Sequence, residues 1–537
     1  MTRQHLIQPG PLARPVRTAP ALADPPPRAA DIVIVGSGMG GSTLAYALRN
    51  RGARVLVLER GDFLPQEPQN WDPQAVFWDK RYKPAEEWHA GDGTAYQPGV
   101  YYWIGGNTKM FGAALTRFRA EDFGELVHRG GVSPAWPLTY AEIEPYYSAA
   151  EDLYRVHGDP TGDPTEPPHS RPYPYPPLPH EPAMAALAHR LSAQGLHPFS
   201  LPMGIDYRPS GACIWCQTCD GFPCRVHAKS DAEVCALRPA LATGNVHLST
   251  RTRVLRLRTD PTGRRVVAAA VERDGERFDV TGDAFVLAAG AANTTAILLR
   301  SAGGPHPRGL ANNADCVGRY YMQHNMSAVM AIAPFKINDT VFQKTLAVND
   351  VYLAGTHARY PLGSLATFGK VTGPILKAMR PHLPLRVLHE LARRSTDWWL
   401  ISEDLPRREN RVVLDARGGI VVHRQLTNYA AHRQLIRFTR RMLQRAGYPL
   451  VLHQEFGLET TSHHCGTARM GTDRATSVVD PTGKAHDLDN LYVADSSVFP
   501  ASGANNPSLT IAALSLRLAD RHFAPRRVQS TAHRSEV

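Results

Sequence analysis

The chain has 537 residues, of which 43% are hydrophobic, so it can bury a large core and is predicted to form two or more domains. Small disulfide scaffolds and disordered proteins are excluded. The net charge is +11, but the basic residues are scattered along the whole length without forming a run. This pattern indicates a general surface property, and no nucleic-acid partner is expected.

The two ends of the chain are predicted to be tails. Residues 1–29 are rich in proline and carry too little apolar surface to offset the entropy of ordering them, so they are expected to be disordered. They also lack the apolar core of a signal peptide, and the longest apolar stretches, 266–271 and 285–292, are too short to span a bilayer. We therefore expect a cytoplasmic protein without a transmembrane anchor, ending in a tail at 526–537.

The first predicted elements follow a β-α-β order: a buried strand at 31–35, a helix at 40–50 and a second strand at 54–59. Further short apolar strands are predicted at 254–257, 284–289 and 491–494. If all of them join one sheet, the domain that contains this sheet is discontinuous in sequence.

A glycine motif lies between the first strand and the helix, with Gly36, Ser37 and Gly38 followed by Gly41. In the pattern G-x-G-x-x-G, Gly36 permits a tight turn, Gly38 lets a pyrophosphate approach the backbone, and Gly41 lets helix and strand pack closely. The pyrophosphate then lies at the helix N-terminus, where free N–H groups favour negative charge. Glu59 ends the next strand and can accept hydrogen bonds from an adenosine ribose, so the sequence predicts a dinucleotide-binding site.

Asp495 bears on the choice between FAD and NAD. It follows the apolar strand at 491–494. A carboxylate at this point suits a hydrogen bond to the ribityl chain of a flavin, which NAD lacks, so FAD is favoured. The alternative is that Asp495 is an ordinary turn residue at the end of a strand.

Further motifs follow in a fixed order along the chain. They are Gly105-Gly106-Asn107-Thr108, the stretch 286–293 that contains Ala289 and Gly290, His463-His464-Cys465-Gly466-Thr467, and Asn505-Asn506-Pro507. With these motifs the chain resembles the glucose-methanol-choline (GMC) oxidoreductases, which are FAD-dependent alcohol oxidases and dehydrogenases. The resemblance extends from Asp31 to about His522.

The resemblance implies an α/β fold with a Rossmann-like FAD-binding domain, discontinuous in sequence, and an α+β substrate-binding domain with an antiparallel sheet. The FAD-binding domain is expected at 30–120, 211–325 and 462–525, and the substrate-binding domain with its connector at 121–210 and 326–461. The loop at 105–114 is expected along the flavin, and the Val254 backbone at the adenine. No histidine occurs between His89 and His128, so FAD is predicted to be bound non-covalently.

Alcohol oxidation by a flavin removes the hydroxyl proton while hydride leaves the carbon. A histidine suits the proton transfer because its ordinary pKa is near 6.5. In the family the base is the histidine of H-x-x-G-T, which falls on His463, and its partner falls on Asn506. His464 is the alternative base, because it is adjacent in sequence.

Four cysteines, Cys213, Cys216, Cys219 and Cys224, have the spacing C-x2-C-x2-C-x4-C. Three interpretations remain open. An iron-sulfur cluster would make the protein an electron-transferring dehydrogenase, and a zinc ion would be structural. Otherwise the segment before Lys229 is a compact loop of partly buried thiols, which is the interpretation that we favour.

The substrate and the electron acceptor are less constrained. A hydroxyl of a sugar, glycoside or aminosugar is the preferred substrate, ahead of a steroid or aliphatic alcohol, and the acceptor is oxygen or an electron carrier. Variable segments such as 320–325, Trp398-Trp399 and the 340s are candidates for the pocket. For Trp398 and Trp399 a place in a core or domain interface is favoured over the pocket. Two other functions stay open, an NAD-dependent dehydrogenase and a catalytically silent flavin-binding protein.

Overall fold

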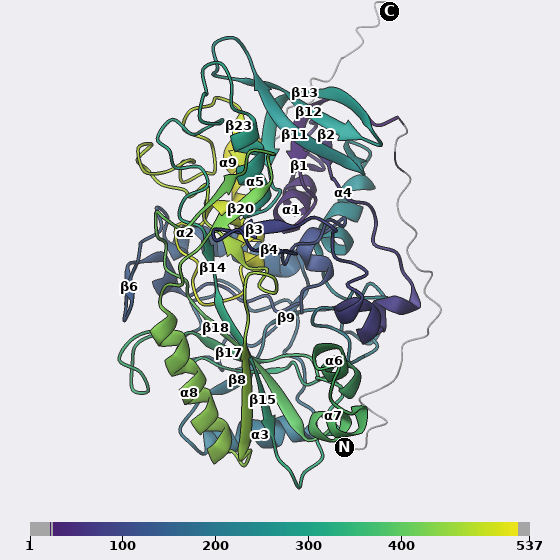
Figure 1. Ribbon diagram of the computed structural model, residues 1–537, viewed down its shortest axis with the longest axis vertical. Helices are drawn as coiled ribbons and strands as arrows, with labels where there is room; N and C mark the ends of the chain where they lie inside the picture. Colours follow the sequence, from purple (N-terminus) through teal and green to yellow (C-terminus); the bar gives the residue numbers. More distant parts are fainter. Residues whose placement is uncertain (1–21, 23–24, 525–537) are drawn as a thin grey trace, which may run out of the picture.

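The computed structural model describes residue 22 and residues 25–524. The predicted tail at 526–537 and most of the tail at 1–29 therefore lie outside the described residues. The chain folds around two large sheets, which occupy the upper and lower parts of the molecule in Figure 1. In the described residues, no helix combines the length and the hydrophobicity needed to cross a membrane.

The upper sheet has seven strands in the order β10-β2-β1-β13-β12-β11, with β23 pairing to β13. Its strands are β1 (Ala29–Val35), β2 (Val55–Leu58), β10 (Val246–Ser249), β11 (Thr252–Thr259), β12 (Val266–Arg273), β13 (Glu276–Leu287) and β23 (Leu491–Val493). The pairs that involve β1, β2, β10 and β23 are parallel, and β11, β12 and β13 pair antiparallel. Every residue of β2 is buried, as is typical of parallel strands covered on both faces.

The predicted β-α-β unit is confirmed as β1, α1 (Met39–Leu48) and β2. The strands predicted at 254–257, 284–289 and 491–494 correspond to parts of β11, β13 and β23, and all three belong to this one sheet. The sheet is therefore assembled from segments far apart in sequence. Strand β10 was not predicted, because the strand has only four residues and these mix apolar with polar side chains.

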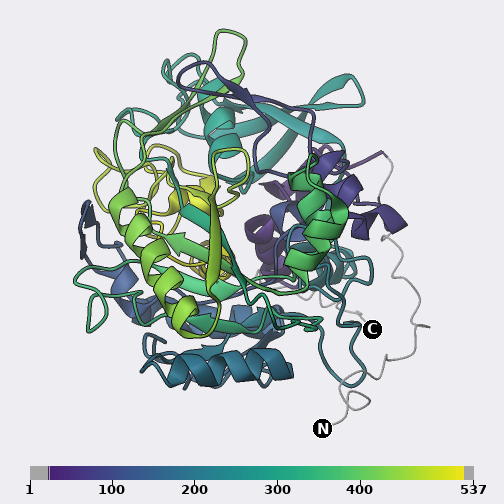
Figure 2. The same cartoon turned by 60° about the horizontal axis from the view of Figure 1, so that its bottom comes forward.

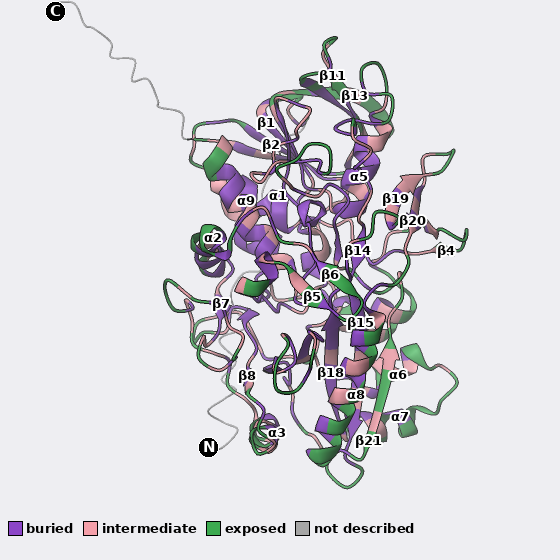
Figure 3. Ribbon diagram, turned by 90° about the vertical axis from the view of Figure 1, so that its left-hand side faces the viewer, coloured by how far each residue is buried: buried purple, intermediate pink, exposed green. Residues whose placement is uncertain are grey.

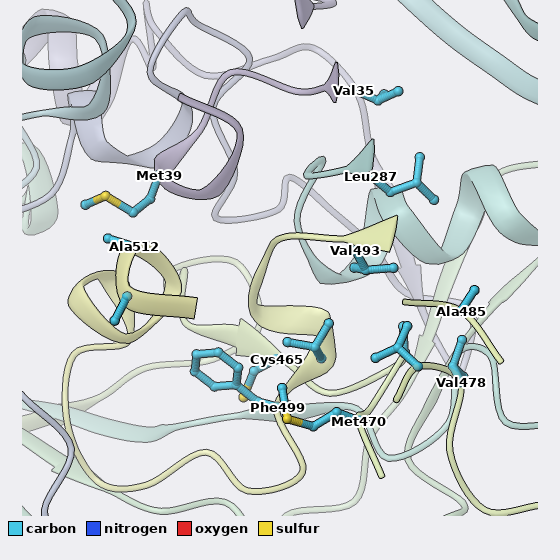
Figure 4. Close-up of a cluster of buried hydrophobic side chains, with 14 of the residues drawn as sticks. Val35, Met39, Leu287, Cys465, Met470, Val478, Ala485, Val493, Phe499 and Ala512 are labelled. Atoms are coloured by element: carbon cyan, nitrogen blue, oxygen red, sulfur yellow. The ribbon is translucent and has the colours of Figure 1, made fainter. Parts of the chain in front are cut away.

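A hydrophobic core joins the carboxyl ends of three parallel strands to the C-terminal part of the chain. Val35, Leu287 and Val493 end β1, β13 and β23, and they lie in one buried cluster with Cys465 and Phe499 (Figure 4). Helix α9 (Ser508–His522) packs on α1 and on α2 (Tyr140–Leu153) beside this cluster. Burial of these side chains fixes the segment around Cys465 against the sheet.

The lower sheet has six strands in the order β21-β15-β18-β17-β16-β8, and all its pairs are antiparallel. They are β8 (Pro198–Ser200), β15 (Asn325–Ile332), β16 (Leu346–Val348), β17 (Ser364–Thr367), β18 (Ser395–Ser402) and β21 (Leu450–Glu455). Helix α8 (Tyr429–Arg445) lies on one side of this sheet, whereas α6 (Gly373–Met379) and α7 (Leu385–Ala392) lie on the other (Figures 1 and 2).

Successive side chains of β18 point to opposite faces of this sheet. Trp398 is fully buried in a core with residues of α8 and α3 (Pro182–Ser192), which confirms its predicted place. The same prediction is wrong for Trp399, because this side chain lines a large cavity on the opposite face.

Figure 3 shows that β1 and β18 are mostly buried, whereas the outer strand β21 and helices α6 and α7 carry exposed residues.

Smaller elements connect the two sheets. They are β3 (Trp88–Ala90), β4 (Ala95–Tyr96), β5 (Leu126–His128), β6 (Gly131–Ser133), β7 (Val156–His157), β9 (Met203–Gly204), α4 (Arg238–Leu241), α5 (Ala291–Arg300), β14 (Met322–Gln323), β19 (Arg411–Leu414), β20 (Ile420–His423) and β22 (His464–Cys465). Short helical turns are η2 (Pro68–Trp71), η3 (Gln74–Trp78), η4 (Gly106–Lys109), η5 (Ala120–Phe123), η6 (Glu233–Leu237) and η7 (Ser496–Val498).

Candidate active site

The predicted glycine turn connects β1 to α1, and two glycines of the G-x-G-x-x-G motif are required by close backbone packing. Gly36 has a φ of +102°, and a Cβ added there would lie 2.4 Å from the carbonyl oxygen of Ala288. A Cβ added at Gly41 would lie 2.0 Å from the carbonyl oxygen of Gly36. Larger residues at these two positions would push α1 and β13 away from β1.

Two other glycines face open space. A Cβ added at Gly38 or at Gly290 would meet no protein atom within 4 Å. Gly38 is the N-cap residue of α1, whose free N–H groups favour a phosphate, and Gly290 is the N-cap residue of α5. The turn therefore has the shape and the donors that the pyrophosphate of a dinucleotide needs, and the residues present fit such a cofactor.

Glu59 lies directly beside the glycine turn, with a side chain that is 6% exposed. Its Oε2 accepts hydrogen bonds from the backbone N–H of Ser37 at 2.9 Å and from the Ser37 hydroxyl at 2.7 Å. Its Oε1 accepts from the N–H of Gly61 at 2.9 Å. The carboxylate thus holds the turn against the end of β2, at the point where the sequence predicts the adenosine ribose.

The loop that begins at Gly105 packs against the same turn. The N–H of Gly105 donates to the Ser37 hydroxyl at 3.3 Å, and a Cβ added at Gly106 would lie 3.1 Å from Cα of Gly38. The Thr108 hydroxyl donates to the Gly105 carbonyl at 2.6 Å, and Asn107 Oδ1 accepts from the N–H of Tyr101 at 2.9 Å. These bonds fix the loop beside Gly38, as expected for a segment that contacts the cofactor.

Asp495 connects the end of β23 to the start of α5. Its Oδ2 accepts from the N–H of Gly290 at 2.9 Å and from the Thr294 hydroxyl at 2.6 Å, and its Oδ1 accepts from the N–H of Ser497 at 2.8 Å. Burial raises the pKa of this carboxyl above its usual range. A carboxylate has about four acceptor sites, so Asp495 can hold this turn and still accept one further hydrogen bond.

The remaining predicted cofactor residues occupy two places. Ala289 lies with Gly290 in the turn between β13 and α5. Val254 lies in β11, where its partner is Val271 and the register shifts between Val254 and Arg256. Its backbone is therefore at an irregular point of an outer strand of the sheet.

His463 and Asn506 line the same cavity, which has a volume of about 730 Å³ and extends to the lower sheet. His464 does not line it in the described structure. The Nε2 of His464 lies 2.8 Å from the Thr461 carbonyl oxygen, and its ring lies 5.8 Å from the rings of both Trp88 and Tyr321. Of the two adjacent histidines, only His463 is therefore placed to meet a molecule in the cavity.

His324 contacts His463 and was not predicted as a site residue. Strand β14 pairs antiparallel with β22 so that Gln323 faces His464, and the next position places His324 opposite His463. Their Nδ1 atoms are 3.0 Å apart. The prediction that 320–325 lines the pocket is wrong, because none of these residues lines the cavity, and His324 contacts His463 instead.

The second nitrogen of His324 settles the direction of this hydrogen bond. Nε2 of His324 lies 3.1 Å from the Ser502 carbonyl oxygen, which can only accept, so this nitrogen must carry a proton. In neutral His324 the Nδ1 atom is then an acceptor, and His463 must donate through its own Nδ1. Neutral His463 is left with its lone pair on Nε2.

The electrostatic surroundings keep both rings neutral near pH 7. Burial lowers the pKa of His463 well below its usual range, and the neighbouring His324, His464 and Lys344 act in the same direction. Burial also lowers the pKa of His324. His463 is therefore able to accept a proton at physiological pH.

Asn506 is held at the cavity by its neighbour. The Thr116 hydroxyl donates to Oδ1 of Asn505 at 2.7 Å, and Nδ2 of Asn505 donates to the Arg117 carbonyl at 3.2 Å. The same Oδ1 accepts from the N–H of Asn506 at 3.2 Å. Asn505 is thus a structural anchor, which leaves the Asn506 side chain to face the cavity.

Arg117 anchors this segment through a buried ionic network. Its guanidinium is fully buried and donates to both carboxylate oxygens of Glu151, each at 2.7 Å. It also donates to Glu144 at 3.0 Å and to the Tyr140 hydroxyl at 2.8 Å. The bidentate pair fixes the position of Arg117, whose carbonyl accepts from Asn505. It thereby helps to hold the segment that contains Asn506 at the cavity.

Known protein families match the segments of the chain that contain these motifs. Models of GMC oxidoreductases match residues 193–326 and 409–515, and a model of NAD(P)-binding Rossmann-like domains matches residues 34–64. A paromamine 6'-oxidase from Streptomyces fradiae is 32% identical over 515 residues, covering 91% of this chain and 90% of that protein. The chain belongs to the GMC oxidoreductase family. The predicted resemblance is thereby confirmed.

Other relatives of this GMC oxidoreductase include a 6'''-hydroxyparomomycin C oxidase from Streptomyces lividus, which is 31% identical with coverage of 93% of this chain and 91% of that protein. Among solved structures, pyridoxine 4-oxidase from Mesorbium loti superposes with a TM-score of 0.63 at 21% identity, covering 92% of this chain and 99% of that chain. This likeness shows a shared fold. Membership of the family together with the dinucleotide-binding domain indicates FAD as the cofactor.

The cysteine-rich segment of this GMC oxidoreductase is tied to the loop after Gly105 by a lysine. The ammonium of Lys229 is buried and donates to the carbonyl oxygens of Phe111 and Phe222, each at 2.7 Å, and of Cys219 at 2.9 Å. All seven cysteines are free. Among the residues that the structure describes, no three or more His, Cys, Asp or Glu side chains are grouped to hold a metal ion.

Proposed function

We propose that this GMC oxidoreductase oxidises a hydroxyl group of a small-molecule alcohol to a carbonyl, with His463 as the general base. The observation that carries the proposal is the hydrogen-bond chain from Ser502 through His324 to His463. This chain leaves the lone pair on Nε2 of a residue that lines the cavity. A neutral imidazole with its free nitrogen at a cavity is the form that can take a proton from a substrate hydroxyl.

FAD fits the site beside the glycine turn, where Gly36, Ser37, Gly38 and Gly41 would bind its pyrophosphate. Glu59 would hold its ribose and Asp495 its ribityl chain, with the Gly105 loop and the Val254 backbone as further contacts. When bound, FAD accepts the hydride that leaves the alcohol carbon. Because the segment between His89 and His128 has no histidine, we propose that FAD is bound without a covalent bond to this loop.

His463 and Asn506 have different roles at the substrate oxygen. Nε2 of His463 accepts the hydroxyl proton, and Nδ1 keeps its proton on the side of His324. The Asn506 amide donates a hydrogen bond to the same oxygen without supplying a proton that would block the base. Because the pKa of His463 is lowered, the protonated ring returns its proton readily to solvent.

The proposed substrate is a hydroxyl of a sugar, glycoside or aminosugar. It is supported by the names of relatives, since the two most similar proteins described above are named for oxidation of paromamine and of 6'''-hydroxyparomomycin C. The electron acceptor is oxygen or an electron carrier.

The test compares His463→Ala with His357→Ala, which removes an exposed histidine. Each protein is purified with FAD, and reduction of the flavin by a panel of alcohols is followed without oxygen. His463→Ala is expected to keep a normal ratio of FAD to protein and to reduce its flavin about 10²–10⁴-fold more slowly, the contribution of a positioned base. Reduction of the flavin in His463→Ala at the rate of His357→Ala would exclude His463 as the base.

A further inference from the structure

The cavity that contains His463 is bounded by one face of the lower sheet. A single row of paired residues crosses all six strands, and each of its members lines the cavity. The row is formed by Gln454, Ala328, Trp399, Ala366, Ala347 and Phe199. The alanines leave space on both sides of Trp399, so this wall is a broad, mostly apolar platform.

Trp399 is the largest side chain of this platform and is held in place by other rings. Its indole stacks on Phe456 with centroids 5.0 Å apart and an interplanar angle of 29°. Phe368 meets it edge-on at 5.7 Å. A fixed aromatic surface of this kind favours contact with an apolar or ring-shaped part of a ligand.

The rows on the two sides of the platform differ in their side chains. Met326, Ile401 and Ser364 form the next row toward His463, and the Ser364 hydroxyl donates to the Ala504 carbonyl at 2.6 Å, close to Asn506 in sequence. On the opposite side of Trp399, Leu452 and Met330 are apolar, and the buried Asp397 continues the same row. Four residues along a strand separate Ile401 from Asp397, so the platform extends roughly 13 Å from the His463 end.

Helices α6 and α7 supply further apolar residues to the cavity. Ile375 and Leu376 come from α6, and Leu388 and Leu391 from α7. Together with the platform they surround a ligand with apolar side chains at the end away from His463. A largely apolar enclosure with a small number of polar groups is typical of sites for small molecules.

The charges that line the cavity do not suit a cation. The basic residues are Lys80, Lys83, Lys344, Lys370 and Arg380, and the acidic ones are Asp220, Asp397 and Glu459. Asp220 pairs with Lys344 and accepts from the N–H of Gly369 at 2.6 Å. Glu459 is exposed.

Asp397 is already satisfied within the protein. It accepts from the N–H of Val371 and from Gln343, each at 3.0 Å, and Lys370 lies 3.9 Å away. In the described lining, every buried carboxylate therefore has a cation beside it. An ammonium group beside Asp220 or Asp397 would lose hydration and meet a carboxylate that is already paired, which is unfavourable, whereas the exposed Glu459 lies where water can still hydrate a cation.

We propose that the substrate is an uncharged amphiphilic alcohol, with its hydroxyl at His463 and Asn506 and an apolar body along the Trp399 platform. This inference rests on the proposed function and narrows its substrate class. It separates the chain from the relative named for oxidation of paromamine, which is an amine, and it is compatible with a glycoside that carries an apolar aglycone.

The test uses the holoenzyme and pairs of alcohols that differ only in their apolar part: methyl and phenyl β-D-glucoside, and 1-propanol and 1-octanol. Paromamine serves as the cationic probe. The apolar member of each pair is expected to have a kcat/KM about tenfold higher or more, because its additional apolar surface is buried against the platform. A higher kcat/KM for paromamine, or equal values within both pairs, would overturn the proposal.

Trp399→Ala is expected to reduce the preference for the apolar members by about tenfold, whereas Trp399→Phe retains an aromatic surface and most of the preference. Phe335→Ala removes a fully exposed aromatic side chain and serves as the control. An unchanged preference in a folded Trp399→Ala protein would contradict the role of the platform.

A binding measurement distinguishes failure of this inference from failure of the proposed function. If no alcohol reduces the flavin, the proposed function fails, and the rise in Tm of the holoenzyme with each probe then decides the inference alone. A larger rise with the apolar members, lost in Trp399→Ala, supports the amphiphilic site. A rise with paromamine alone rejects it.

Discussion

The Nδ1 atoms of His463 and His324 lie 3.0 Å apart, and the opposite nitrogen of His324 faces the Ser502 carbonyl oxygen at 3.1 Å. Two hydrogen bonds thus connect the proposed base to a backbone group that can only accept. Because a carbonyl cannot change its role, the tautomers of both rings follow from it. The orientation of His463 depends on the pairing of β14 with β22 and on the buried segment at 502–506.

Replacement of His324 should therefore slow catalysis without removing the base. His324→Phe is expected to lower the rate of flavin reduction by less than His463→Ala, because Nε2 of His463 remains but its tautomer and orientation are no longer fixed. His324→Gln retains a donor and an acceptor in one group and should recover part of the rate. Rapid-mixing measurements of flavin reduction give both values.

The matched control is His432→Phe. His432 is also buried, accepts or donates hydrogen bonds with Ser327 and Ser402, and has a pKa lowered to about 4 by burial, but it lies on the α8 side of the lower sheet. Equal losses of rate in His324→Phe and His432→Phe, or no recovery in His324→Gln, would show that His324 has only a structural role.

The pH dependence of kcat/KM should reflect the lowered pKa of His463. The base works when unprotonated, so activity is expected to persist below pH 6.5, the ordinary pKa of histidine, and to fall only as pH drops through the lowered value. Lys344→Gln removes a positive charge that lowers this pKa and should move the acid limb of the profile to higher pH. Lys336→Gln, at an exposed position, should leave it in place. A shift to lower pH in Lys344→Gln would have the wrong sign.

Asp495 should control how firmly FAD is held. In Asp495→Asn an amide N–H₂ replaces one of the oxygens that accept from Gly290, Thr294 and Ser497, which leaves buried donors facing a donor at a cost of about 1–3 kcal/mol. The ratio of FAD to protein after gel filtration is expected to fall. Asp489→Asn changes an exposed residue just before the same strand and is expected to retain FAD. Full FAD content in Asp495→Asn would count against its role.

Arg117 should be important for stability. Arg117→Met leaves the Glu151 carboxylate buried without its cation, which is expected to destabilise the fold by about 3–5 kcal/mol and to lower Tm. The double variant Arg117→Met/Glu151→Leu removes both charges and should recover much of the loss. Arg277→Met breaks the exposed pair with Glu272 and should cost about 1 kcal/mol or less. A double variant that is less stable than Arg117→Met would contradict this account.

The local part of the fold was predictable from the sequence. The run from β1 through the glycine turn to β2 depends on neighbours in the chain: apolar strands, a glycine with positive φ and a carboxylate at the end of the next strand. These signals are short-range, so the sequence alone places Gly36, Gly38 and Glu59 correctly on their elements. Asp495 was linked to this domain by its position after an apolar strand.

The relationships that complete the candidate site arise from pairing between distant segments. His324 and His463 are 139 residues apart, and their contact follows from the register of two strands of two residues each, which no periodicity indicates. Trp399 was misplaced for a similar reason. Two adjacent tryptophans in a strand must face opposite sides, but only the packing of α8 on one side shows which of them enters the cavity.

The seven-stranded sheet also determines how much of the chain must be synthesised before the site beside the glycine turn can form. Its strands come from residues 29–58, 246–287 and 491–493, and α1 is covered by α9 near the end of the described chain. The ribosome must therefore synthesise the chain through β23 and α9 before the glycine turn gains all its neighbours, and parallel pairing of such distant segments is slow. The site beside the glycine turn is therefore complete only once β23 has been synthesised. A chain that ends before β23 would contain the complete glycine motif but could not complete the sheet around it.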